Sequence, residues 1–598
     1  MKERLIFGYD PFVLPFTLGM VFIILYLLVG TIRIILALDN GERKLLLKSF
    51  LPNMFFKNVK EIILDCLIHV KIFRKNLLLG YMHSSIAFGW FMLILIGHIE
   101  VILYTPQRTG VLYYPVFFRY FVMETHETLR GSFFFFLMDL SLLLVLSGIG
   151  LAFFKRFHSR VLGMRRTTKL RLGDKIAMYS LWAIFPLRLL AESFTADISG
   201  GSFLTISINR LLTAFVTNPN NILPVWWTYS SVLGLFLFAL PFSRYMHIPT
   251  EILLIVLRNA GIKSSISRDG FAESEIYSCS RCGICIDACP MSAKKRNIKF
   301  SSVYYIRLLR RRSDESLNAA DKCLMCNKCV DACPVGIDST RLKLLKRQEE
   351  HGKNRVNFEY LSSVENIDNK ADGILYYAGC MTHLSPAIYK SLFKILDKAH
   401  VDYTFLDYNG SICCGRPLML SGNVEGARKL IEKNTELIKA SGCKTLLLSC
   451  PICYKIFNEE YNLEGINIVH HSVYINDLAR SGKILLKKST ESFVFHDPCE
   501  LGRGSDIYDE PRELLSGIGV VKEASQERKE SICCGGSLGS LTLSFTEREQ
   551  ITKLSLMSLL KNNPDKVVTA CPLCLKSFSF HNDRPTRDIA QIVSENLI

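Results

Sequence analysis

The chain has 598 residues, of which 49% are hydrophobic, and a formal net charge of +17 at pH 7. At roughly 100–200 residues per domain, this length predicts several domains. Much of the positive charge lies in short loops between long apolar runs in residues 1 to about 250, so we expect no nucleic acid as a partner. Eighteen of the 20 cysteines stand in motifs, and cysteines grouped at C-x-x-C spacing in a large intracellular chain favour metal sites over disulfides.

Five apolar stretches in the first part of the chain match the roughly 20 residues that a helix needs to cross a bilayer. The first stretch is too long, and begins too far from any cleavage-like site, to be a removable signal peptide. We therefore predict a five-span all-α membrane bundle, with spans at about 11–37, 79–104, 131–154, 175–194 and 223–248.

The loops between these stretches differ in charge. Those at about 38–78 and 155–174 carry eight and seven Lys or Arg residues, whereas the alternate loops carry three and one. Basic loops stay on the cytoplasmic side of a membrane. The pattern predicts a multi-pass protein of the cytoplasmic membrane, with the N-terminus outside and everything after about residue 250 in the cytoplasm.

Two histidines occupy matching depths in this predicted bundle. His83 lies near the start of the second span and His247 at the end of the fifth, so both would be near the cytoplasmic face. Two imidazoles from facing helices can ligate a b-type haem. This part of the chain resembles the gamma subunit of respiratory nitrate reductase and the membrane subunits of heterodisulfide reductase, in which haem b is held between the second and last spans.

The same resemblance argues against a second haem, because the positions of its ligands are Leu93 and Tyr229 here. One alternative stays open: His98 could be a ligand if a partner such as His126 reached it.

Charged residues inside predicted spans are costly and usually have a role. Asp139 lies in the third span, and Arg188 and Glu192 lie one helical turn apart in the fourth. These charges could neutralise one another for structural reasons, or they could form a quinone or proton-handling site away from the haem.

Two cysteine runs of the bacterial ferredoxin type follow the membrane part, each ending in Cys-Pro and repeating at an offset of 44 residues. In such paired runs the fourth cysteine of each serves the other cluster. A basic helix is expected between them at Tyr304–Arg312, giving a helical dicluster ferredoxin domain with two cubane [4Fe-4S] clusters. The expected ligands are Cys279, Cys282, Cys285 and Cys333 for cluster one, and Cys323, Cys326, Cys329 and Cys289 for cluster two.

Ten further cysteines form two copies of one pattern: a lone Cys, then Cys-Cys-Gly, then Cys-Pro-X-Cys. Five thiols per copy exceed the four that a zinc ion or a cubane uses. Apolar runs at 374–377 and 493–496 precede the lone cysteines, and others at 446–448 and 567–568 precede Cys-Pro-X-Cys, which predicts small α/β domains with cysteines at strand ends. The copies are Cys380, Cys413, Cys414, Cys450, Cys453 and Cys499, Cys533, Cys534, Cys571, Cys574.

This region resembles the catalytic subunit of heterodisulfide reductase, and also the iron–sulfur subunits of anaerobic glycerol-3-phosphate dehydrogenase and lactate utilisation. The match includes His496-Asp497-Pro498-Cys499, although a family-typical His after that Cys is Glu500 here. The resemblance implies that each five-cysteine set holds a noncubane [4Fe-4S] cluster and that all ten cysteines are candidate catalytic residues. One noncubane cluster and a second site of different content, such as zinc, is the alternative.

The order of parts is similar over nearly the whole chain to fused membrane-bound oxidoreductases that resemble the heterodisulfide reductase D/E pair joined into one polypeptide. That group includes electron-transfer-flavoprotein:menaquinone oxidoreductases. The expected domains are a membrane haem b domain at 1–255, a ferredoxin domain at 256–350, and cysteine-rich domains at 372–485 and 492–598.

We therefore predict an iron–sulfur and haem b oxidoreductase that passes electrons between a cytoplasmic carrier, first of all electron-transfer flavoprotein, and a membrane quinone. Two rivals stay open. Reduction of a small-molecule or protein disulfide at a noncubane cluster would require the cysteine-rich site to open to solvent. A non-enzymatic redox sensor or scaffold would show no quinone turnover.

Overall fold

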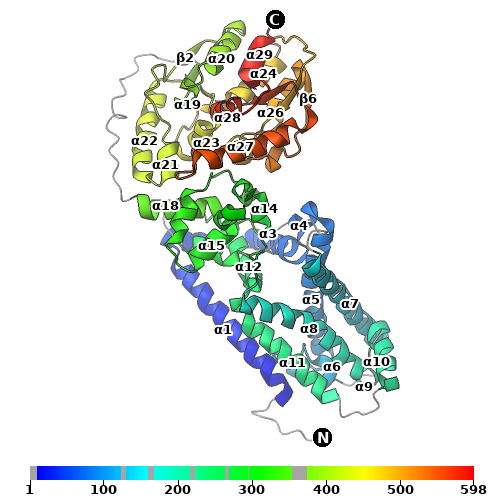
Figure 1. The fold of residues 1–598 in the computed structure, drawn as a ribbon. Helices are drawn as coiled ribbons and strands as arrows, with labels where there is room; N and C mark the ends of the chain where they lie inside the picture. Colours follow the sequence, from blue (N-terminus) through cyan, green and yellow to red (C-terminus); the bar gives the residue numbers. More distant parts are fainter. Residues whose placement is uncertain are drawn as a thin grey trace. The chain divides into compact units, whose positions relative to one another are not determined.

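The computed structural model describes residues 10–122, 129–158, 168–215, 222–262, 269–293, 295–352 and 373–598. The chain divides into two compact units, residues 1–283 and 284–598. The described residues of the first unit form helices and connecting turns, and the second unit adds two parallel sheets (Figure 1). The boundary falls between Cys282 and Cys285, inside the predicted ferredoxin domain.

Five long helices build the first unit: α1 (Leu14–Leu36), α5 (Leu77–Tyr104), α7 (Leu129–Phe157), α8 (Leu172–Phe194) and α11 (Ile222–Ala239). Helix α5 packs along α7, while α11 packs between α1 and α8. Glycines permit the closest approach: a Cβ on Gly234 of α11 would lie 2.3 Å from the carbonyl oxygen of Pro15 in α1. Small residues serve this purpose where apolar helices pack without a strong hydrophobic driving force. The shorter helices are α2 (Asn40–Lys48), α3 (Pro52–Ile62), α4 (Val70–Lys75), α6 (Phe118–Phe121), α9 (Ala196–Ser199), α10 (Phe203–Phe215), α12 (His247–Asn259) and α13 (Gly270–Ser278).

Among the described residues, four helical stretches are long and apolar enough to cross a membrane: Pro11–Leu36, Leu77–Tyr104, Gly131–Phe157 and Ile222–Phe242. They correspond to the first, second, third and fifth predicted spans. The fourth predicted span, at 175–194, is helix α8, which is long enough but carries Asp174, Lys175, Arg188 and Glu192.

The predicted fifth span at 223–248 is not one helix, which corrects the placement of His247. Helix α11 ends at Ala239, two short 3₁₀ turns follow at Leu240–Phe242 and Arg244–Met246, and His247 is the first residue of α12. The break has a local cause, because Pro241 has no amide hydrogen to donate to the preceding turn. The Ser243 side chain then accepts a hydrogen bond from the backbone of Tyr245.

The second unit begins with the larger part of the ferredoxin segment. Its basic helix, α15 (Ser302–Arg310), begins two residues before the expected Tyr304. Short helices carry the third cysteine of each run, Cys285 in α14 and Cys329 in α17, and these two helices pack against each other. The other helices here are α14 (Ile284–Ala288), α16 (Glu315–Asp321), α17 (Lys328–Asp331) and α18 (Ser339–His351).

Each cysteine-rich region contains a four-stranded parallel sheet, in the order β2-β1-β3-β4 in the first and β6-β5-β7-β8 in the second. The central strands are those that the apolar runs before the cysteines predict. The α/β prediction is therefore confirmed for both regions. The strands are β1 (Ile374–Tyr377), β2 (Tyr403–Phe405), β3 (Thr445–Leu448), β4 (Asn467–His470), β5 (Ser492–Phe495), β6 (Val520–Lys522), β7 (Lys566–Thr569) and β8 (Thr586–Asp588).

The two sheets share their hydrophobic cores. One cluster joins Tyr376 and Leu447 of the first sheet to Phe493 and Val568 of the second. Helix α20 packs against α29, and α24 against α26, so the two regions fold as one body. Their helices are α19 (Cys380–His383), α20 (Ala387–Lys398), α21 (Arg416–Ser421), α22 (Val424–Ala440), α23 (Pro451–Glu460), α24 (His471–Arg480), α25 (Gly502–Ser505), α26 (Asp509–Ile518), α27 (Phe545–Leu559), α28 (Pro572–Ser579) and α29 (Ile589–Glu595).

Candidate functional site

One cavity in the ferredoxin segment collects thiols from both cysteine runs. Cys289, the last cysteine of the first run, lines it together with Cys323, Cys326 and Cys329 of the second. These are the four thiols that the sequence assigns to cluster two. Four convergent thiols in a largely buried pocket have the donor set of a cubane [4Fe-4S] cluster, so the residues fit that group.

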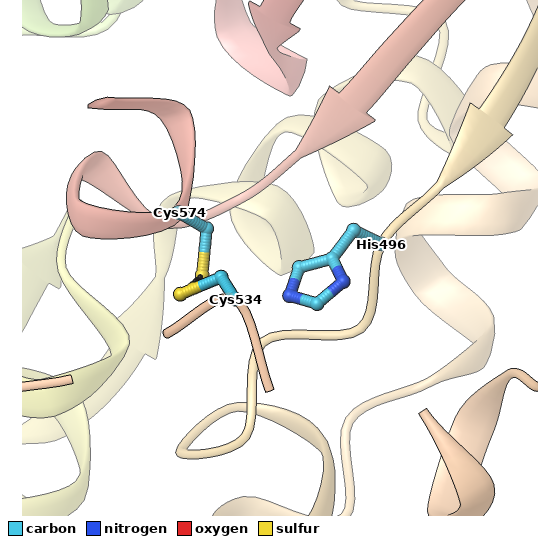
Figure 2. A group of neighbouring side chains, drawn as sticks. All are labelled: His496, Cys534 and Cys574. Carbon is cyan, nitrogen blue, oxygen red and sulfur yellow. Dashed lines mark hydrogen bonds between the residues drawn. The ribbon is translucent and has the colours of Figure 1, made fainter. Parts of the chain in front are cut away.

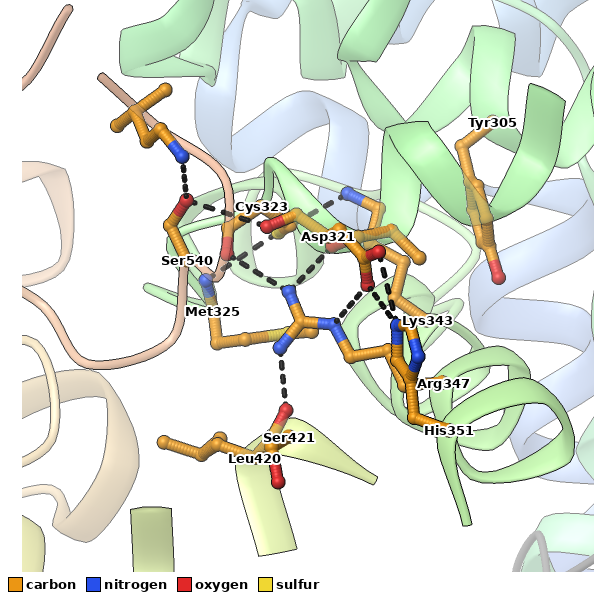
Figure 3. Close-up of polar contacts among 12 residues, drawn as sticks. Tyr305, Asp321, Cys323, Met325, Lys343, Arg347, His351, Leu420, Ser421 and Ser540 are labelled. Carbon is orange, nitrogen blue, oxygen red and sulfur yellow. Dashed lines mark hydrogen bonds and ion pairs between the residues drawn. The ribbon is translucent and has the colours of Figure 1, made fainter. Parts of the chain in front are cut away.

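A buried lysine faces this cavity. Lys343 of α18 is 2% exposed, and its ammonium donates a hydrogen bond to the Cys323 sulfur at 3.3 Å (Figure 3). Burial alone would lower the pKa of Lys343, but the thiols of Cys323, Cys329 and Cys289 raise it overall. A buried cation at this position would offset the negative charge of a thiolate-ligated cluster.

One helical turn further on, Arg347 ties the ferredoxin segment to the first cysteine-rich region. Its guanidinium donates hydrogen bonds to the carbonyl oxygens of Ala320 and Leu420, both at 2.5 Å, and lies 3.5 Å from the Asp321 carboxylate (Figure 3). The imidazole of His351 lies 3.0 Å from the same carboxylate. This buried network fixes the loop that leads into Cys323.

The four residues assigned to cluster one are divided between the two units. Cys279 and Cys282 belong to the first unit, and Cys285 and Cys333 to the second. Their grouping therefore stays a prediction.

The cavity of cluster two adjoins the second cysteine-rich site. Cys326 and Cys533 lie in one buried cluster of side chains, with Cys289 and Cys499 packed against it. A hydrogen bond from Cys533 lowers the pKa of the Cys326 thiol to about 5, and nearby Arg503 acts in the same direction. Thiols assigned to two different metal centres thus touch.

Arg503 lies at this junction. Its side chain donates hydrogen bonds to the carbonyl oxygens of Cys326 at 2.8 Å and Ser531 at 2.8 Å. Burial alone would lower the pKa of Arg503, but the thiols of Cys326, Cys499 and Cys533 raise it. Arg503 is thus a fixed cation between the two groups of thiols.

The second cysteine-rich site continues inward from Cys533. The sulfurs of Cys534 and Cys574 are 3.2 Å apart, and Cys574 is also hydrogen-bonded to Cys571. His496 points toward Cys534 and Cys574 from the end of β5 (Figure 2). The structure therefore brings the five predicted thiols of this copy into one continuous group.

The first cysteine-rich site has the same construction. Hydrogen bonds from Cys413 and Cys453 hold the pKa of the buried Cys414 thiol well below its usual range. Cys450 is hydrogen-bonded to Cys453, and Cys380 is the one exposed cysteine of the described residues. The first copy is therefore open where the second is covered.

Glycines make room at both sites. Gly379 has φ +80°, and a Cβ there would lie 2.8 Å from the Cys453 sulfur, so only glycine leaves this space beside the thiols. Gly535, which follows the double cysteine, has φ +82°, and a Cβ there would lie 2.7 Å from the carbonyl oxygen of Arg548. The second glycine thus permits packing against α27.

Between the two sites lies a buried group of charges. The Glu500 carboxylate of the second region lies 3.5 Å from Arg416 and 3.3 Å from Lys455, both from the first region. Burial raises the pKa of Glu500, but these two cations lower it overall. Glu500, which replaces a family-typical His, is therefore a link between the two cysteine-rich regions.

In the first unit, His83 lies within electrostatic range of His247 and of a third histidine, His69. The rings of His69 and His83 stack with centroids 5.5 Å apart. His247 has Nδ1 2.7 Å from the carbonyl oxygen of Arg244, which makes Nδ1 the donor and leaves Nε2 as the nitrogen with a lone pair. This tautomer fits a haem ligand. The sequence reasoning missed His69, which lies in a predicted loop without a distinguishing pattern.

The charges inside the predicted spans have structural partners. Asp139 accepts hydrogen bonds from the backbone of Leu204 and Thr205 at the start of α10. Arg188 and Glu192 pair at 2.9 Å within α8. These contacts favour the structural role over a quinone site.

The possible second haem pair is not supported by an observed contact. His98 lies with Nδ1 2.8 Å from the carbonyl oxygen of Ile94 in its own helix. His126 lies outside the described residues.

Comparison with known families agrees with this geometry. Residues 275–337 match the family of 4Fe-4S dicluster domains, and residues 374–458 and 493–579 each match the family of cysteine-rich domains.

Three curated relatives are similar to part of this chain. The D component of dihydromethanophenazine:CoB–CoM heterodisulfide reductase from Methanosarcina acetivorans is 30% identical, over 37% of this chain and 57% of the relative. The EtfAB:quinone oxidoreductase of Syntrophomonas wolfei is 30% identical, over 35% of this chain and 31% of the relative. The probable iron–sulfur-binding oxidoreductase FadF of Bacillus subtilis is 24% identical, over 56% of this chain and 48% of the relative. The matches thus span about a third to somewhat over half of these relatives.

The two family models match the regions that hold the cysteine sites, and the relatives are named as oxidoreductases. In sequence, this chain is similar to iron–sulfur oxidoreductases of the heterodisulfide reductase and EtfAB:quinone oxidoreductase type.

Proposed function

We propose that the chain is a membrane-bound oxidoreductase that carries electrons between a soluble cytoplasmic carrier and the membrane quinone pool. The observation that carries the proposal is the contact between Cys326 and Cys533. It puts a ferredoxin site directly beside a cysteine-rich site, as an electron relay requires. When bound, the iron–sulfur clusters and haem b each take up and release single electrons.

The protein's own part in this function is to hold the sites and set their charge. Cys289, Cys323, Cys326 and Cys329 would hold one cubane [4Fe-4S] cluster, and the other ferredoxin cysteines a second. The two five-cysteine groups would hold noncubane clusters. Lys343 and Arg503 supply buried positive charge where thiolates gather. Electron transfer between these centres needs no acid–base residue, whereas reduction of the quinone to quinol takes up two protons together with two electrons.

At the membrane end, we propose a five-span bundle with the N-terminus outside. Helix α8 would be the remaining span, with its Arg188–Glu192 pair neutralised internally. The basic loops support a cytoplasmic position for the iron–sulfur regions. His83 and His247 would hold haem b near the cytoplasmic face, because the two imidazoles lie within electrostatic range of each other and the hydrogen bond from His247 Nδ1 orients its ring.

We propose reduced electron-transfer flavoprotein as the soluble carrier, supported by the relative named EtfAB:quinone oxidoreductase. The test uses purified full-length protein in lipid nanodiscs, mixed anaerobically with reduced flavoprotein and then with a menaquinone analogue. The haem absorbance should show reduction and then reoxidation. If dithionite reduces the haem but reduced flavoprotein does not, electron-transfer flavoprotein is not the carrier. If the purified protein contains no haem, the proposed haem site at His83 and His247 is wrong.

A second function, reduction of a disulfide, is favoured by the exposure of Cys380 in the first cysteine-rich site. It is also the activity in the name of the heterodisulfide reductase relative. In the same nanodisc preparation, a disulfide substrate would then reoxidise the reduced protein without added quinone. Failure of every disulfide tested, together with rapid flavoprotein oxidation, would leave the relay as the function.

A further inference from the structure

The two cysteine-rich sites differ at one matched position. Tyr377 and His496 each stand three residues before the first cysteine of their copy, at the ends of the equivalent strands β1 and β5. The Tyr377 hydroxyl donates a hydrogen bond to the carbonyl oxygen of Ile412 at 3.0 Å. Tyr377 therefore has a complete structural role within its own domain.

His496 has no such bond to a carbonyl oxygen. It is 1% exposed, and within the described part of the chain neither of its ring nitrogens has a nitrogen or oxygen atom as hydrogen-bond partner; its polar contact is with the thiol of Cys534. Its ring meets Phe578 edge-on, with centroids 4.7 Å apart. Buried polar groups are nearly always paired, so a buried imidazole whose polar contact is a thiol is placed to share whatever that thiol binds.

The nearest candidate partners are thiols. A ring nitrogen of His496 and the sulfurs of Cys534 and Cys574 all lie within 4.8 Å of one another, and each residue is buried (Figure 2). A single metal atom could bind all three after small side-chain movements. Imidazole nitrogen and thiolate sulfur together suit zinc and iron–sulfur iron, and histidine replaces cysteine as an iron ligand in some clusters.

We propose that His496 supplies a nitrogen ligand to the metal centre of the second cysteine-rich site. This centre would have mixed nitrogen and sulfur ligands, whereas the first, with Tyr377 at the matched position, would have sulfur ligands only. The proposal rests on the proposed function only in taking the second site to hold a metal centre. It also agrees with the grouping of the thiols, because Cys499 and Cys533 pack with Cys326, whereas His496 groups with Cys534 and Cys574.

The test uses full-length protein containing ¹⁵N-labelled histidine. Pulsed EPR is recorded at the field positions of the cluster signals, away from those of low-spin haem, because the haem histidines would otherwise contribute. A strong ¹⁵N coupling from a directly bound imidazole is expected there. It should be lost in His496→Asn and kept in the matched control Tyr377→Phe.

The outcomes separate this inference from the proposed function. Cluster signals without a strong nitrogen coupling overturn the ligand role of His496 and leave the electron relay standing. The second site could instead contain zinc, with a nitrogen ligand seen in its X-ray absorption spectrum and lost in His496→Asn. That result supports the ligand role of His496 and overturns the second noncubane cluster. If His496→Asn does not fold, the labelled unsubstituted protein still decides whether the cluster has a nitrogen ligand.

Discussion

The two cysteine-rich regions share a sheet order and a cysteine pattern, yet their surroundings differ. In the second, Cys499 and Cys533 pack against the cavity of a ferredoxin cluster, with Arg503 between them. In the first, the corresponding Cys380 is exposed. Two regions of one fold thus present one site that adjoins the ferredoxin cavity and one with a cysteine exposed to solvent. In the relay that we propose, the first site would exchange electrons with the carrier and the second would pass them to the ferredoxin segment.

The most damaging change to this arrangement should be Cys326→Ser. It removes a thiol that lines the cavity proposed for cluster two and that contacts Cys533. We expect the loss of one [4Fe-4S] cluster, measured as iron and sulfide per chain, and no haem reduction by flavoprotein. Cys443→Ser is the control, because Cys443 is buried outside the motifs and contacts the Ile438 carbonyl. Normal electron transfer in Cys326→Ser would show that the route does not pass this junction.

A substitution in the buried ion pairs that link the two cysteine-rich regions should be nearly as damaging. Glu500→Gln removes the buried carboxylate from Arg416 and Lys455 and leaves them only the more distant, exposed carboxylate of Glu459, at 3.9 and 3.8 Å. Breaking a buried ion pair in this way costs about 3–5 kcal/mol, so the free energy of unfolding should fall by that order. Denaturant unfolding of the full chain would measure it, with the exposed Glu460→Gln as control. Equal stability of the two variants would mean that Glu500 does not join the regions.

Arg503→Leu should change redox potentials rather than stability alone. Without the guanidinium, the added negative charge of a reduced centre beside Cys326 and Cys533 is less well compensated. Loss of an interaction with a charged group is worth about 1.5–3 kcal/mol, equivalent to roughly 60–130 mV for one electron, so the potential should fall. EPR-monitored redox titration would measure this. Leu384 stands at the same spacing after Cys380 and is exposed, and Leu384→Ala should leave the potentials unchanged.

Lys343→Met also tests whether a buried cation raises the redox potential of a neighbouring cluster. It removes one hydrogen bond, from the Lys343 ammonium to the Cys323 sulfur. The potential of cluster two should fall by several tens of millivolts, up to about 100 mV. Lys346→Met, one turn away and paired with Glu350 at the surface, should have no effect. A potential shift in both variants would point to a general effect of charge instead of the specific contact.

The smallest expected effect is a pH dependence of the stability of the first cysteine-rich region. Asp407 accepts hydrogen bonds from the backbone of Ala378 and Gly379, next to Cys380, and its contact with His383 raises the pKa of that imidazole. A raised pKa means that the stabilisation is complete below the ordinary histidine pKa and is lost as the pH rises through the raised value. His383 is partly exposed, so the loss should be at most about 1 kcal/mol.

Hydrogen exchange at pH 6 and pH 8 would measure this effect in the segment around Cys380. The change should disappear in His383→Gln. The same change around Cys499, where no histidine occupies the equivalent place, would contradict the assignment.

Local pattern in the sequence predicted much of the fold. Apolar runs that end at Cys380 and Cys499 are the central strands β1 and β5, because buried parallel strands leave such continuous runs. The pairing of Cys289 with the second run was also expected from the motif, and the two share a cavity. The helix break before His247 was missed, although Pro241 gives a local signal for it.

The tertiary contacts of the sites could not be predicted in this way. Nothing in the sequence distinguishes Lys343, which faces cluster two, from Lys346, which faces solvent, since both lie in one basic helix. The contact between Cys326 and Cys533 depends on how the ferredoxin segment packs against the second cysteine-rich region. The environment of His496 likewise depends on β5 and α28 coming together.

The most direct test of the account is the magnetic interaction between the centre at Cys323, Cys326 and Cys329 and the centre at Cys499 and Cys533. EPR of partly reduced full-length protein should show spin–spin broadening or faster relaxation of the cluster two signal, because the thiols of the two sites are in contact. The effect should disappear in Cys533→Ser and persist in the matched Cys413→Ser. Two magnetically independent centres in the unsubstituted protein, both shown to be paramagnetic, would contradict the direct junction.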